Sequence, residues 1–151
     1  CDAWAGTDRP VLLVDRSVAM LRVARQRLEG VGTLLQADLL DLPLRPGAFG
    51  TACCFGVIHV LPDPEAALRQ LWTVVAPGGR LWLTSLTAVR RLPARLWYAA
   101  LLRAGEVGPA RTPDDLARMV ATVTGARPEV EVEGAFALLM ARKPEPVPGT
   151  S

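Results

Sequence analysis

The sequence has 151 residues, half of them hydrophobic, which suits a single domain of ordinary size with a substantial core. Its formal net charge is only +2 and its arginines are scattered, which excludes the concentrated basic stripe of most nucleic-acid-binding proteins. It has no apolar run of the ~20 residues that a membrane span requires, no signal peptide, and three cysteines without metal-binding spacing. We therefore expect a cytoplasmic protein with buried free thiols and no metal site.

The first predicted unit is a strand, a tight turn and a helix. Residues 11–14 form a continuous run of β-forming apolar residues, typical of a strand buried on both faces of a parallel sheet. This strand ends at Asp15, and Ser17 is a good N-cap for a helix whose apolar residues recur at helical spacing. A second short strand is predicted over residues 33–37, and it ends at Asp38.

The middle of the chain repeats this alternation. A third strand is predicted over residues 51–55 and ends at Gly56. Asp63 caps the next helix, whose predicted buried face consists of four apolar residues: Leu68, Leu71, Trp72 and Val75. The Pro77-Gly78-Gly79 turn is expected to end that helix, and residues 80–86 form the fourth strand.

The last part of the chain changes character. Two amphipathic helices are predicted, one over residues 92–104 and one that begins at Thr112. Two strands over residues 127–133 and 135–142, joined at Gly134, predict an antiparallel hairpin. The alternation of strands and helices predicts an α/β fold with a mainly parallel sheet that ends in this hairpin.

Candidate ligand-binding residues follow the predicted strands. In parallel sheets ligands bind beyond the carboxyl ends of the strands, so we expect Asp15, Asp38 and the Phe55-Gly56 turn to meet at one edge. The two carboxylate oxygens of Asp15 can accept hydrogen bonds from two ribose hydroxyls. The alternative for Asp15 is a strand-end acid that is stabilised by the dipole of the following helix.

Asp38 and His59 also have two interpretations each. Asp38 can accept the exocyclic amine of adenine while the N–H of Leu39 serves a ring nitrogen, or it can simply form a turn. His59, the only histidine, lies in the predicted loop after the third strand. It can act as a general base, hold a substrate, or pack locally. Met20 and Val60 can form apolar walls of a site or belong to the core.

In this order, the elements resemble the class I S-adenosylmethionine-dependent methyltransferases, and in particular the small-molecule branch typified by ubiquinone and menaquinone biosynthesis methyltransferases. The resemblance covers roughly residues 9–143 and is carried by four stretches: "VLLVDRSVAMLRVARQRL", "LLQADLLDLPLRPGAFGTACCFGVIHVLPDPEAALRQL", "VVAPGGRLWLTS" and "EVEVEGAFALLMARKP". It implies a Rossmann-like methyltransferase sheet in one domain over residues 1–143. The tail over residues 144–151, with three prolines followed by Gly-Thr-Ser, is expected to be disordered. The implied reaction moves a methyl group from S-adenosyl-L-methionine to a small-molecule acceptor.

The resemblance also implies residue roles on the adenosine side of the cofactor. Asp15, next to Arg16, would take the ribose hydroxyls, and Met20 would line the adenine pocket. Asp38 and Leu39 would bind the edge of the adenine ring.

Further roles are implied on the methionine side. Phe55 and Gly56 would pass beside the methionine portion of the cofactor. His59 would lie near the methyl acceptor as the catalytic residue. Residues 88–125 would form a variable cover over the acceptor.

The sequence departs from this family pattern in one large respect. The chain begins with Cys1, and neither the first strand of the family nor its glycine-rich loop is present, because Gly6 stands alone. Two smaller departures are Gly50, where the family often has Asp, and Val60 after His59. We therefore expect an N-terminally truncated fragment that binds the cofactor weakly and has weak or no activity alone. Sheet edges left without a partner would favour homo-oligomers or aggregation.

Two other functions are compatible with parts of the sequence. An NAD-dependent oxidoreductase shares the acid after a strand, but Asp38, the Pro-Gly-Gly turn and the antiparallel end argue against it. A non-catalytic methyltransferase-like scaffold would retain the fold without the reaction. The sequence leaves the identity of the acceptor, its reacting atom and the oligomeric state open.

Overall fold

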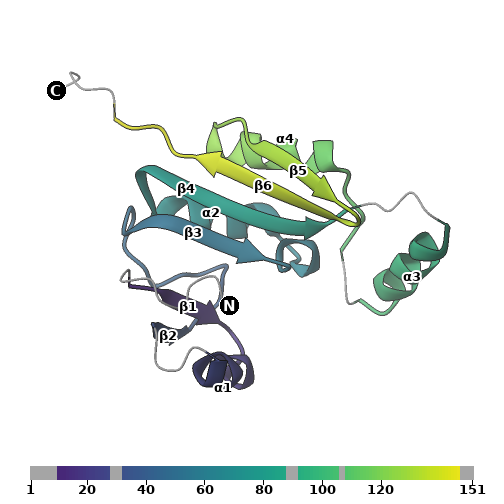
Figure 1. Cartoon of the computed structure of the whole chain (residues 1–151), viewed down its shortest axis with the longest axis horizontal. Coiled ribbons are helices and arrows are strands. Elements are labelled where there is room, and N and C mark those ends of the chain that lie inside the picture. The colour runs from purple at the N-terminus through teal and green to yellow at the C-terminus, as the bar shows by residue number, and fades with distance from the viewer. Residues whose placement is uncertain (1–9, 28–31, 88–91, 106–107, 147–151) are drawn as a thin grey trace. The chain divides into compact units, whose positions relative to one another are not determined.

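The computed structural model describes residues 10–27, 32–87, 92–105 and 108–146 (Figure 1). They form two compact units, residues 1–43 (unit 1) and residues 44–151 (unit 2), and each is described by itself. In chain order the elements are β1 (Leu12–Asp15), α1 (Val18–Arg27), β2 (Thr33–Gln36), β3 (Phe49–Phe55), η2 (Ile58–Val60), α2 (Pro64–Val74), β4 (Val75–Leu86), α3 (Leu92–Arg103), α4 (Pro113–Thr124), β5 (Glu129–Glu133) and β6 (Phe136–Arg142).

Unit 1 is a strand–helix–strand unit with a small core. β1 and β2 pair in parallel, from Leu12 opposite Thr33 to Asp15 opposite Gln36. The predicted N-cap of α1 is confirmed, because Ser17 Oγ accepts a hydrogen bond from the N–H of Met20 at 3.3 Å.

Unit 2 contains a four-stranded sheet in the order β3-β4-β6-β5. β3 and β4 are parallel, whereas β6 is antiparallel to both β4 and β5. The predicted parallel strands with an antiparallel hairpin at the C-terminal end are therefore confirmed. The strands bounding this hairpin are shorter than predicted, since β5 begins at Glu129 and β6 at Phe136.

Helices α2 and α4 contact each other and cover one face of the four-stranded sheet (Figure 1). Asp63 caps α2 as predicted, because its Oδ1 accepts from the N–H of Ala66 at 2.8 Å. Apolar side chains from α2, α4 and the facing side of the strands are almost completely buried between these layers: Leu68, Leu81, Leu83, Leu116, Val120 and Leu139.

The Pro-Gly-Gly segment does not lie where the sequence pattern put it. Helix α2 ends at Val74 and the strand begins directly at Val75, so residues 77–79 lie within β4 and not before it. The prediction that Val75 belongs to the buried face of the helix is wrong. Hydrogen bonding explains this, because the N–H of Gly78 donates to Lys143 O at 3.0 Å and the N–H of Lys143 donates to Gly79 O at 2.9 Å.

Gly79 allows a close approach of β3 to β4. A Cβ atom at this position would lie 2.7 Å from Gly50 O and 2.8 Å from Ala76 O, which is closer than real Cβ contacts come. Any side chain here would therefore push β3 away from β4.

Lys143, the only lysine of the sequence, forms hydrogen bonds with the C-terminal end of α2. Its Nζ donates to Trp72 O at 2.7 Å and to Val75 O at 2.8 Å, and it lies 5.4 Å from the centre of the Trp72 ring. A cation at these carbonyls favours the helix end electrostatically. Trp72 is only half-buried, because this ring covers the lysine at the edge of the core.

The adjacent cysteines of β3 face opposite sides of the sheet, as alternation along a strand requires. Cys54 is buried and Cys53 is half-buried, and both are free thiols. Burial raises the pKa of both thiols, that of Cys54 to about 12, with a contribution from neighbouring Cys53. Cys1 lies outside the described residues.

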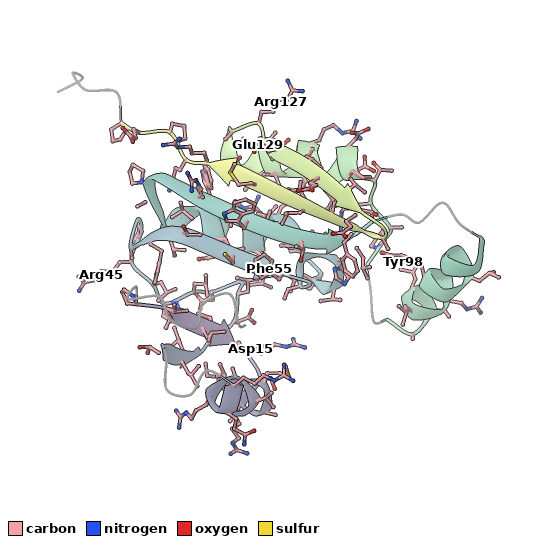
Figure 2. The ribbon with its side chains drawn as sticks, viewed as in Figure 1. Asp15, Arg45, Phe55, Tyr98, Arg127 and Glu129 are labelled. Atoms are coloured by element: carbon pink, nitrogen blue, oxygen red, sulfur yellow. The ribbon has the colours of Figure 1, made fainter. Side chains whose placement is uncertain are left out.

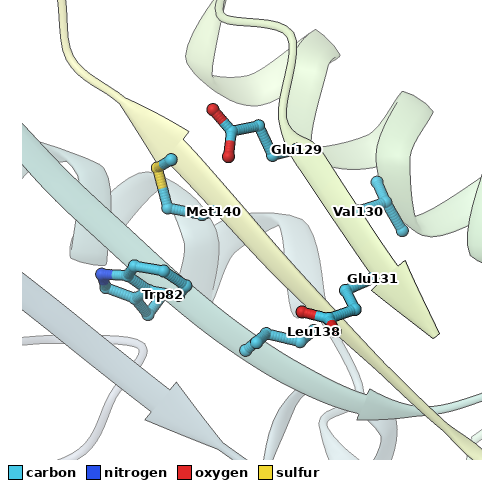
Figure 3. A pocket seen from close by; sticks show the side chains of 6 residues that line it. All are labelled: Trp82, Glu129, Val130, Glu131, Leu138 and Met140. Carbon is cyan, nitrogen blue, oxygen red and sulfur yellow. The ribbon is translucent and has the colours of Figure 1, made fainter. Parts of the chain in front are cut away.

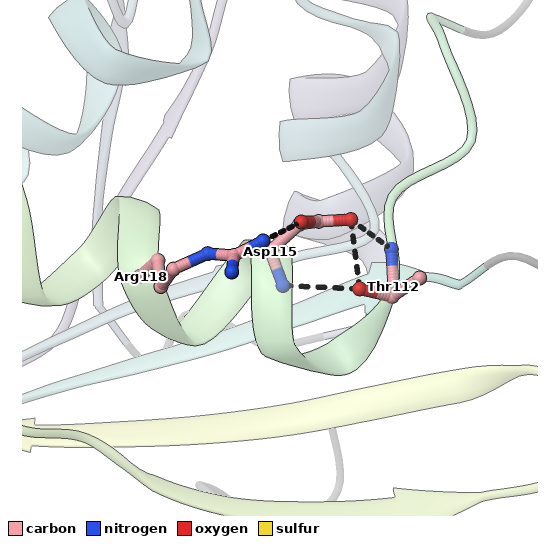
Figure 4. A network of polar contacts seen from close by, with 3 residues as sticks. All are labelled: Thr112, Asp115 and Arg118. Carbon is pink, nitrogen blue, oxygen red and sulfur yellow. Dashed lines mark hydrogen bonds and ion pairs between the residues drawn. The ribbon is translucent and has the colours of Figure 1, made fainter.

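Helix α4 begins with a complete capping box (Figure 4). Thr112 Oγ1 accepts from the N–H of Asp115 at 3.1 Å, and Asp115 Oδ2 accepts from the N–H of Thr112 at 3.0 Å. These bonds, first of all the one from the Thr112 hydroxyl, hold the pKa of Asp115 below its usual range, and the Arg118 guanidinium adds to the effect. Gly125 ends the helix in the left-handed conformation, at φ 69°.

The expected acceptor cover and tail are described in part. The cover, residues 88–125, contains α3 and α4, while residues 88–91 and 106–107 lie outside the described residues. Of the expected disordered tail, residues 147–151 lie outside them as well. No helix in the described ranges is long and apolar enough to cross a membrane.

Candidate functional site

Unit 1 brings Asp15 and Asp38 to the same edge of its sheet. Because β1 and β2 run in parallel, their carboxyl ends lie together, and Asp15 pairs with Gln36, two residues before Asp38. The Nε2 of Gln36 donates to Arg16 O at 3.2 Å, which ties the end of β2 to the turn after β1. We call Asp15, Arg16, Met20, Asp38 and Leu39 the unit-1 group.

Asp15 orders the turn that follows it. Its Oδ1 accepts from the N–H of Ser17 at 2.8 Å, so the side chain closes the turn into α1. This bond occupies one carboxylate oxygen and leaves Oδ2 for another donor. The half-buried Asp15 (Figure 2) therefore supports the start of α1 through this bond, and its binding of ribose hydroxyls stays a prediction.

Like Asp15, Asp38 accepts a hydrogen bond from a backbone N–H two residues further along the chain. Its Oδ1 accepts from the N–H of Leu40 at 2.9 Å, and its carbonyl accepts from the N–H of Asp41 at 3.1 Å. The turn-forming interpretation of Asp38 is thus confirmed, while Oδ2 is left for a ligand. The N–H of Leu39 has no hydrogen-bond acceptor among the described residues.

Arg16 and Met20, two further members of the unit-1 group, are exposed. Arg16 points to the surface of the unit, and Met20 is 55% exposed on α1. Met20 therefore does not belong to the core, which excludes one of its two interpretations. The same holds for Val60 in unit 2, which is 46% exposed.

Unit 2 carries the second group, Phe55, Gly56 and His59, at the carboxyl end of β3. Phe55 is 53% exposed and pairs with Thr84 of β4 (Figure 2). The N–H of Gly56 donates to Thr84 O at 3.2 Å and to Thr84 Oγ1 at 3.0 Å. Gly56 has φ 70°, a left-handed conformation that a residue with a Cβ adopts at a cost.

His59 lies in η2 and is buried, with 8% exposure. Its Nδ1 accepts from the N–H of Leu86 at 3.4 Å, so in the neutral ring the proton is on Nε2. Burial lowers the pKa of His59 and favours this neutral form. The ring can thus donate a hydrogen bond from Nε2, whereas accepting a proton at Nε2 would give the charged form that burial disfavours.

Sequence reasoning missed two hydrogen bonds near this histidine and the contact of Thr84 with Gly56. The backbone N–H of Gly108 donates to His59 O at 2.6 Å, and the hydroxyl of Tyr98 donates to Gly108 O at 2.9 Å. A Cβ at Gly108 would lie 3.1 Å from His59 O, so glycine suits this approach. Thr84 was missed because a threonine inside a strand carries no signal, and Gly108 because its partner is 49 residues away in the chain.

The structure thus describes two groups and not one complete site. Asp15 and Asp38 lie together in unit 1, and Phe55, Gly56 and His59 lie together in unit 2. The acceptors of the unit-1 group suit a ligand with hydroxyl and amine groups, because free carboxylate oxygens accept hydrogen bonds and cannot donate them. Within the described residues, no group of three or more His, Cys, Asp or Glu side chains could hold a metal ion.

Known proteins resemble this chain in sequence. The demethylmenaquinone methyltransferase of Chlamydia pneumoniae is 34% identical over 82 residues, which are 54% of this chain and 36% of that protein. The ubiquinone biosynthesis O-methyltransferase of Xanthomonas euvesicatoria is 32% identical over 106 residues, which are 66% of this chain and 42% of that protein. The match thus covers about two fifths or less of the length of these relatives.

Structure and family comparisons agree with this likeness. An O-methyltransferase family protein from Burkholderia thailandensis has a TM-score of 0.70 at 18% identity, covering 90% of this chain and 44% of that one. At this identity the likeness shows a shared fold. Residues 1–83, more than half of the chain, match the family described as "Methyltransferase domain". The chain therefore belongs to the methyltransferase-domain family.

Proposed function

We propose that this chain carries the cofactor-binding residues of a methyltransferase that moves a methyl group from S-adenosyl-L-methionine to a small-molecule acceptor. The observation that carries the proposal is the family match over residues 1–83. That match includes both carboxylates at the ends of parallel strands, Asp15 and Asp38. Ligands of open parallel sheets bind at this edge.

In the proposal, the unit-1 group binds the adenosine portion. The Oδ2 of Asp15 accepts from a ribose hydroxyl, while its Oδ1 keeps the turn in place through Ser17. The Oδ2 of Asp38 accepts the exocyclic amine of adenine, and the unused N–H of Leu39 donates to a ring nitrogen. The exposed Met20 side chain covers the ring.

In the proposal, the second group, described by itself in unit 2, serves the methionine portion of the cofactor and the acceptor, as the family resemblance implies. The exposed ring of Phe55 and the open backbone at Gly56, where no atom lies within 4 Å of a hypothetical Cβ, leave room for an aliphatic chain. We assign His59 the role of holding the acceptor through Nε2–H. This choice rests on the bond from Leu86 to Nδ1, which makes Nε2 a donor.

The cofactor supplies a sulfonium methyl group that is already activated for displacement. In the transfer, the methyl carbon would bond to the acceptor as the carbon–sulfur bond breaks, the electron pair would stay on sulfur, and the acceptor's proton would pass to water. The protein mainly has to align the acceptor with that methyl group, which can contribute up to ~7–11 kcal/mol. The likeness to a demethylmenaquinone methyltransferase and to a ubiquinone biosynthesis O-methyltransferase favours a quinone precursor as the acceptor.

The test is a titration of the isotope-labelled 151-residue chain with S-adenosylhomocysteine, followed by amide resonances. The amides of Leu39 and Gly56 are expected to shift, at ligand concentrations well above micromolar. Asp38→Asn keeps an oxygen for the N–H of Leu40 and removes the charge, so it should weaken binding about tenfold or more. The matched control is Asp41→Asn, which changes an exposed carboxylate of the same turn.

Four outcomes separate the alternatives. No shift at saturating ligand, or equal binding by Asp38→Asn and the unchanged chain, would contradict the proposal. Stronger shifts with NADH than with S-adenosylhomocysteine would favour an oxidoreductase. Micromolar affinity would support the cofactor and would contradict the expectation that the chain binds it weakly.

A further inference from the structure

Tyr98, the only tyrosine of the sequence, is buried on α3, a helix whose other described side chains are exposed or half-buried (Figure 2). It is 6% exposed, whereas Leu96 and Leu102 on the same helix are 69% and 44% exposed. A buried tyrosine hydroxyl needs a hydrogen-bond partner, and this one donates to Gly108 O at 2.9 Å. A polar contact therefore helps to set the position of this side chain.

Gly108 connects this contact to η2. Its carbonyl accepts from Tyr98, and its N–H donates to His59 O at 2.6 Å. Carbonyl groups at the end of a helix have no partner within the helix, so the N–H of Gly108 supplies the partner that His59 O needs. Because η2 has three residues and the poorer hydrogen-bond geometry of a 3₁₀-helix, contacts from outside help to fix its position.

His59 is thus held by hydrogen bonds at its ring and at its backbone. The ring Nδ1 accepts from the N–H of Leu86 at the end of β4, at 3.4 Å, and the carbonyl accepts from Gly108. The bond to the ring is long, so by itself it holds the ring weakly. The backbone bond keeps η2 in the place where the ring can make it. Together the two bonds set the direction in which the Nε2–H of His59 donates.

The shallow hollow on the four-stranded sheet is separate from this arrangement. Trp82, Leu138 and Met140 line it together with residues of β5, and its volume is about 200 Å³ (Figure 3). It is smaller than the ~300–1,000 Å³ of typical small-molecule sites. Neither His59 nor Tyr98 lines it. The contacts that can position a ligand at the histidine are therefore those around η2.

We propose that Tyr98 is a positioning residue for His59, and that it fixes the direction of the Nε2–H by holding Gly108 against η2. This inference rests on the proposed function, in which that N–H holds the methyl acceptor. Burial raises the pKa of Tyr98 and outweighs the opposite effect of the Arg111 charge, so the hydroxyl keeps its proton and donates at neutral pH. The position of α3 is in this way coupled to the group that holds the acceptor.

The test observes the histidine directly, because the sequence has only one. The 151-residue chain is labelled with ¹⁵N-histidine and measured well above the ordinary histidine pKa of about 6.5, where the ring is neutral. Tyr98→Phe keeps the aromatic ring and removes the hydroxyl. The Nδ1 and Nε2 resonances of His59 are expected to move toward each other, because a ring released from Leu86 exchanges between its two neutral forms. The amide of Gly108 should exchange hydrogen about 10-fold faster, as the loss of one hydrogen bond predicts.

Two further variants test the same contact. Thr73→Val is the matched control, because it removes a hydroxyl that donates to a backbone carbonyl elsewhere in unit 2, Arg69 O at 2.8 Å. It should leave both His59 resonances unchanged. Gly108→Ala keeps the hydroxyl of Tyr98 but puts a Cβ 3.1 Å from His59 O, so it should move the two resonances as Tyr98→Phe does.

Unchanged His59 resonances in Tyr98→Phe would overturn the proposal. Equal changes in Tyr98→Phe and Thr73→Val would also overturn it, because they would reflect a general loss of stability. In a titration with S-adenosylhomocysteine, Tyr98→Phe should bind as the unchanged chain does, and a loss of binding by this variant alone would contradict a role on the acceptor side. If the unchanged chain does not bind the ligand, the proposed function fails, while the His59 resonances still decide whether Tyr98 positions the ring.

Discussion

Units 1 and 2 both place polar groups at the carboxyl ends of two parallel strands, but they bury those strands to different extents. In unit 1 the strands have four residues each and all residues of β1 are half-buried, while Leu21 and Leu42 are the buried apolar side chains of its described part. In unit 2, β4 has 12 residues, and Leu81 and Leu83 are almost completely buried beneath α2 and α4.

This difference shows that similar arrangements of residues at strand ends can depend on hydrophobic cores of very different size. Each fully buried aliphatic side chain contributes ~1.5–3 kcal/mol, so the larger core of unit 2 stabilises its strands more. The carboxylates of Asp15 and Asp38 depend on the smaller core. We expect unit 1 to open at a lower free energy than unit 2, as regions with few buried contacts do.

The largest expected effect on the free energy of unfolding comes from a substitution in unit 2, the better-packed unit. Gly79→Ala would put a Cβ 2.7 Å from Gly50 O, and because this nearest neighbour is a backbone atom of β3, β3 and β4 have to separate. We expect a loss of about 3 kcal/mol or more in the free energy of unfolding, measured by chemical denaturation. Gly50→Ala is the matched control, because no atom lies within 4 Å of that Cβ. Equal stability of both variants would contradict the close packing of β3 on β4.

The next prediction compares the two cores directly. Leu68→Ala removes a side chain with 0% exposure from unit 2 and should lower the free energy of unfolding by about 2–5 kcal/mol. Leu21→Ala in unit 1 should instead speed hydrogen exchange in β1 and β2 and leave the denaturation midpoint of unit 2 almost unchanged. A common shift of that midpoint by both variants would show that the units unfold together.

A smaller effect concerns pH and unit 2 alone. The folded chain binds a proton at His59 less readily than the unfolded chain, because burial lowers its pKa. Stability is therefore fully present above the ordinary histidine pKa of about 6.5 and is lost as pH falls through the lowered pKa. His59→Gln should flatten this part of the thermal midpoint–pH curve, and since the sequence has one histidine, the comparison is direct. An unchanged slope would mean that His59 is not buried.

The smallest expected effect is at the exposed start of α4. The pKa of Asp115 is lowered by its bonds to Thr112, so its contribution is present above the ordinary aspartate pKa and is lost as pH falls through the lowered value. Asp115→Asn should reduce stability slightly at neutral pH, and the difference from the unchanged chain should vanish in acid. Asp114→Asn is the control, because the capping box does not use that side chain. A difference that persists in acid would point to packing.

Local sequence signals predicted most elements and the turn chemistry of the candidate residues. The apolar run before Asp15, the caps at Ser17 and Asp63, and the hairpin at Gly134 all depend on neighbouring residues, so they could be identified from the sequence. The Pro-Gly-Gly segment was misplaced because its conformation depends on hydrogen bonds to Lys143, 64 residues further along the chain than Gly79.

The sequence by itself determined the residue types at the strand ends, the order of strands and helices, and thus the family resemblance. Tertiary structure alone decided how those residues are used. His59 became a donor through a contact with Leu86, and its carbonyl was bound by Gly108. Strand pairing also set the glutamates of β5 beside Phe136, Leu138 and Met140. The physical reason is the separation along the chain over which each interaction acts. Propensities and caps act over a few residues, whereas hydrogen-bond partners and sheet faces are set by segments distant in sequence.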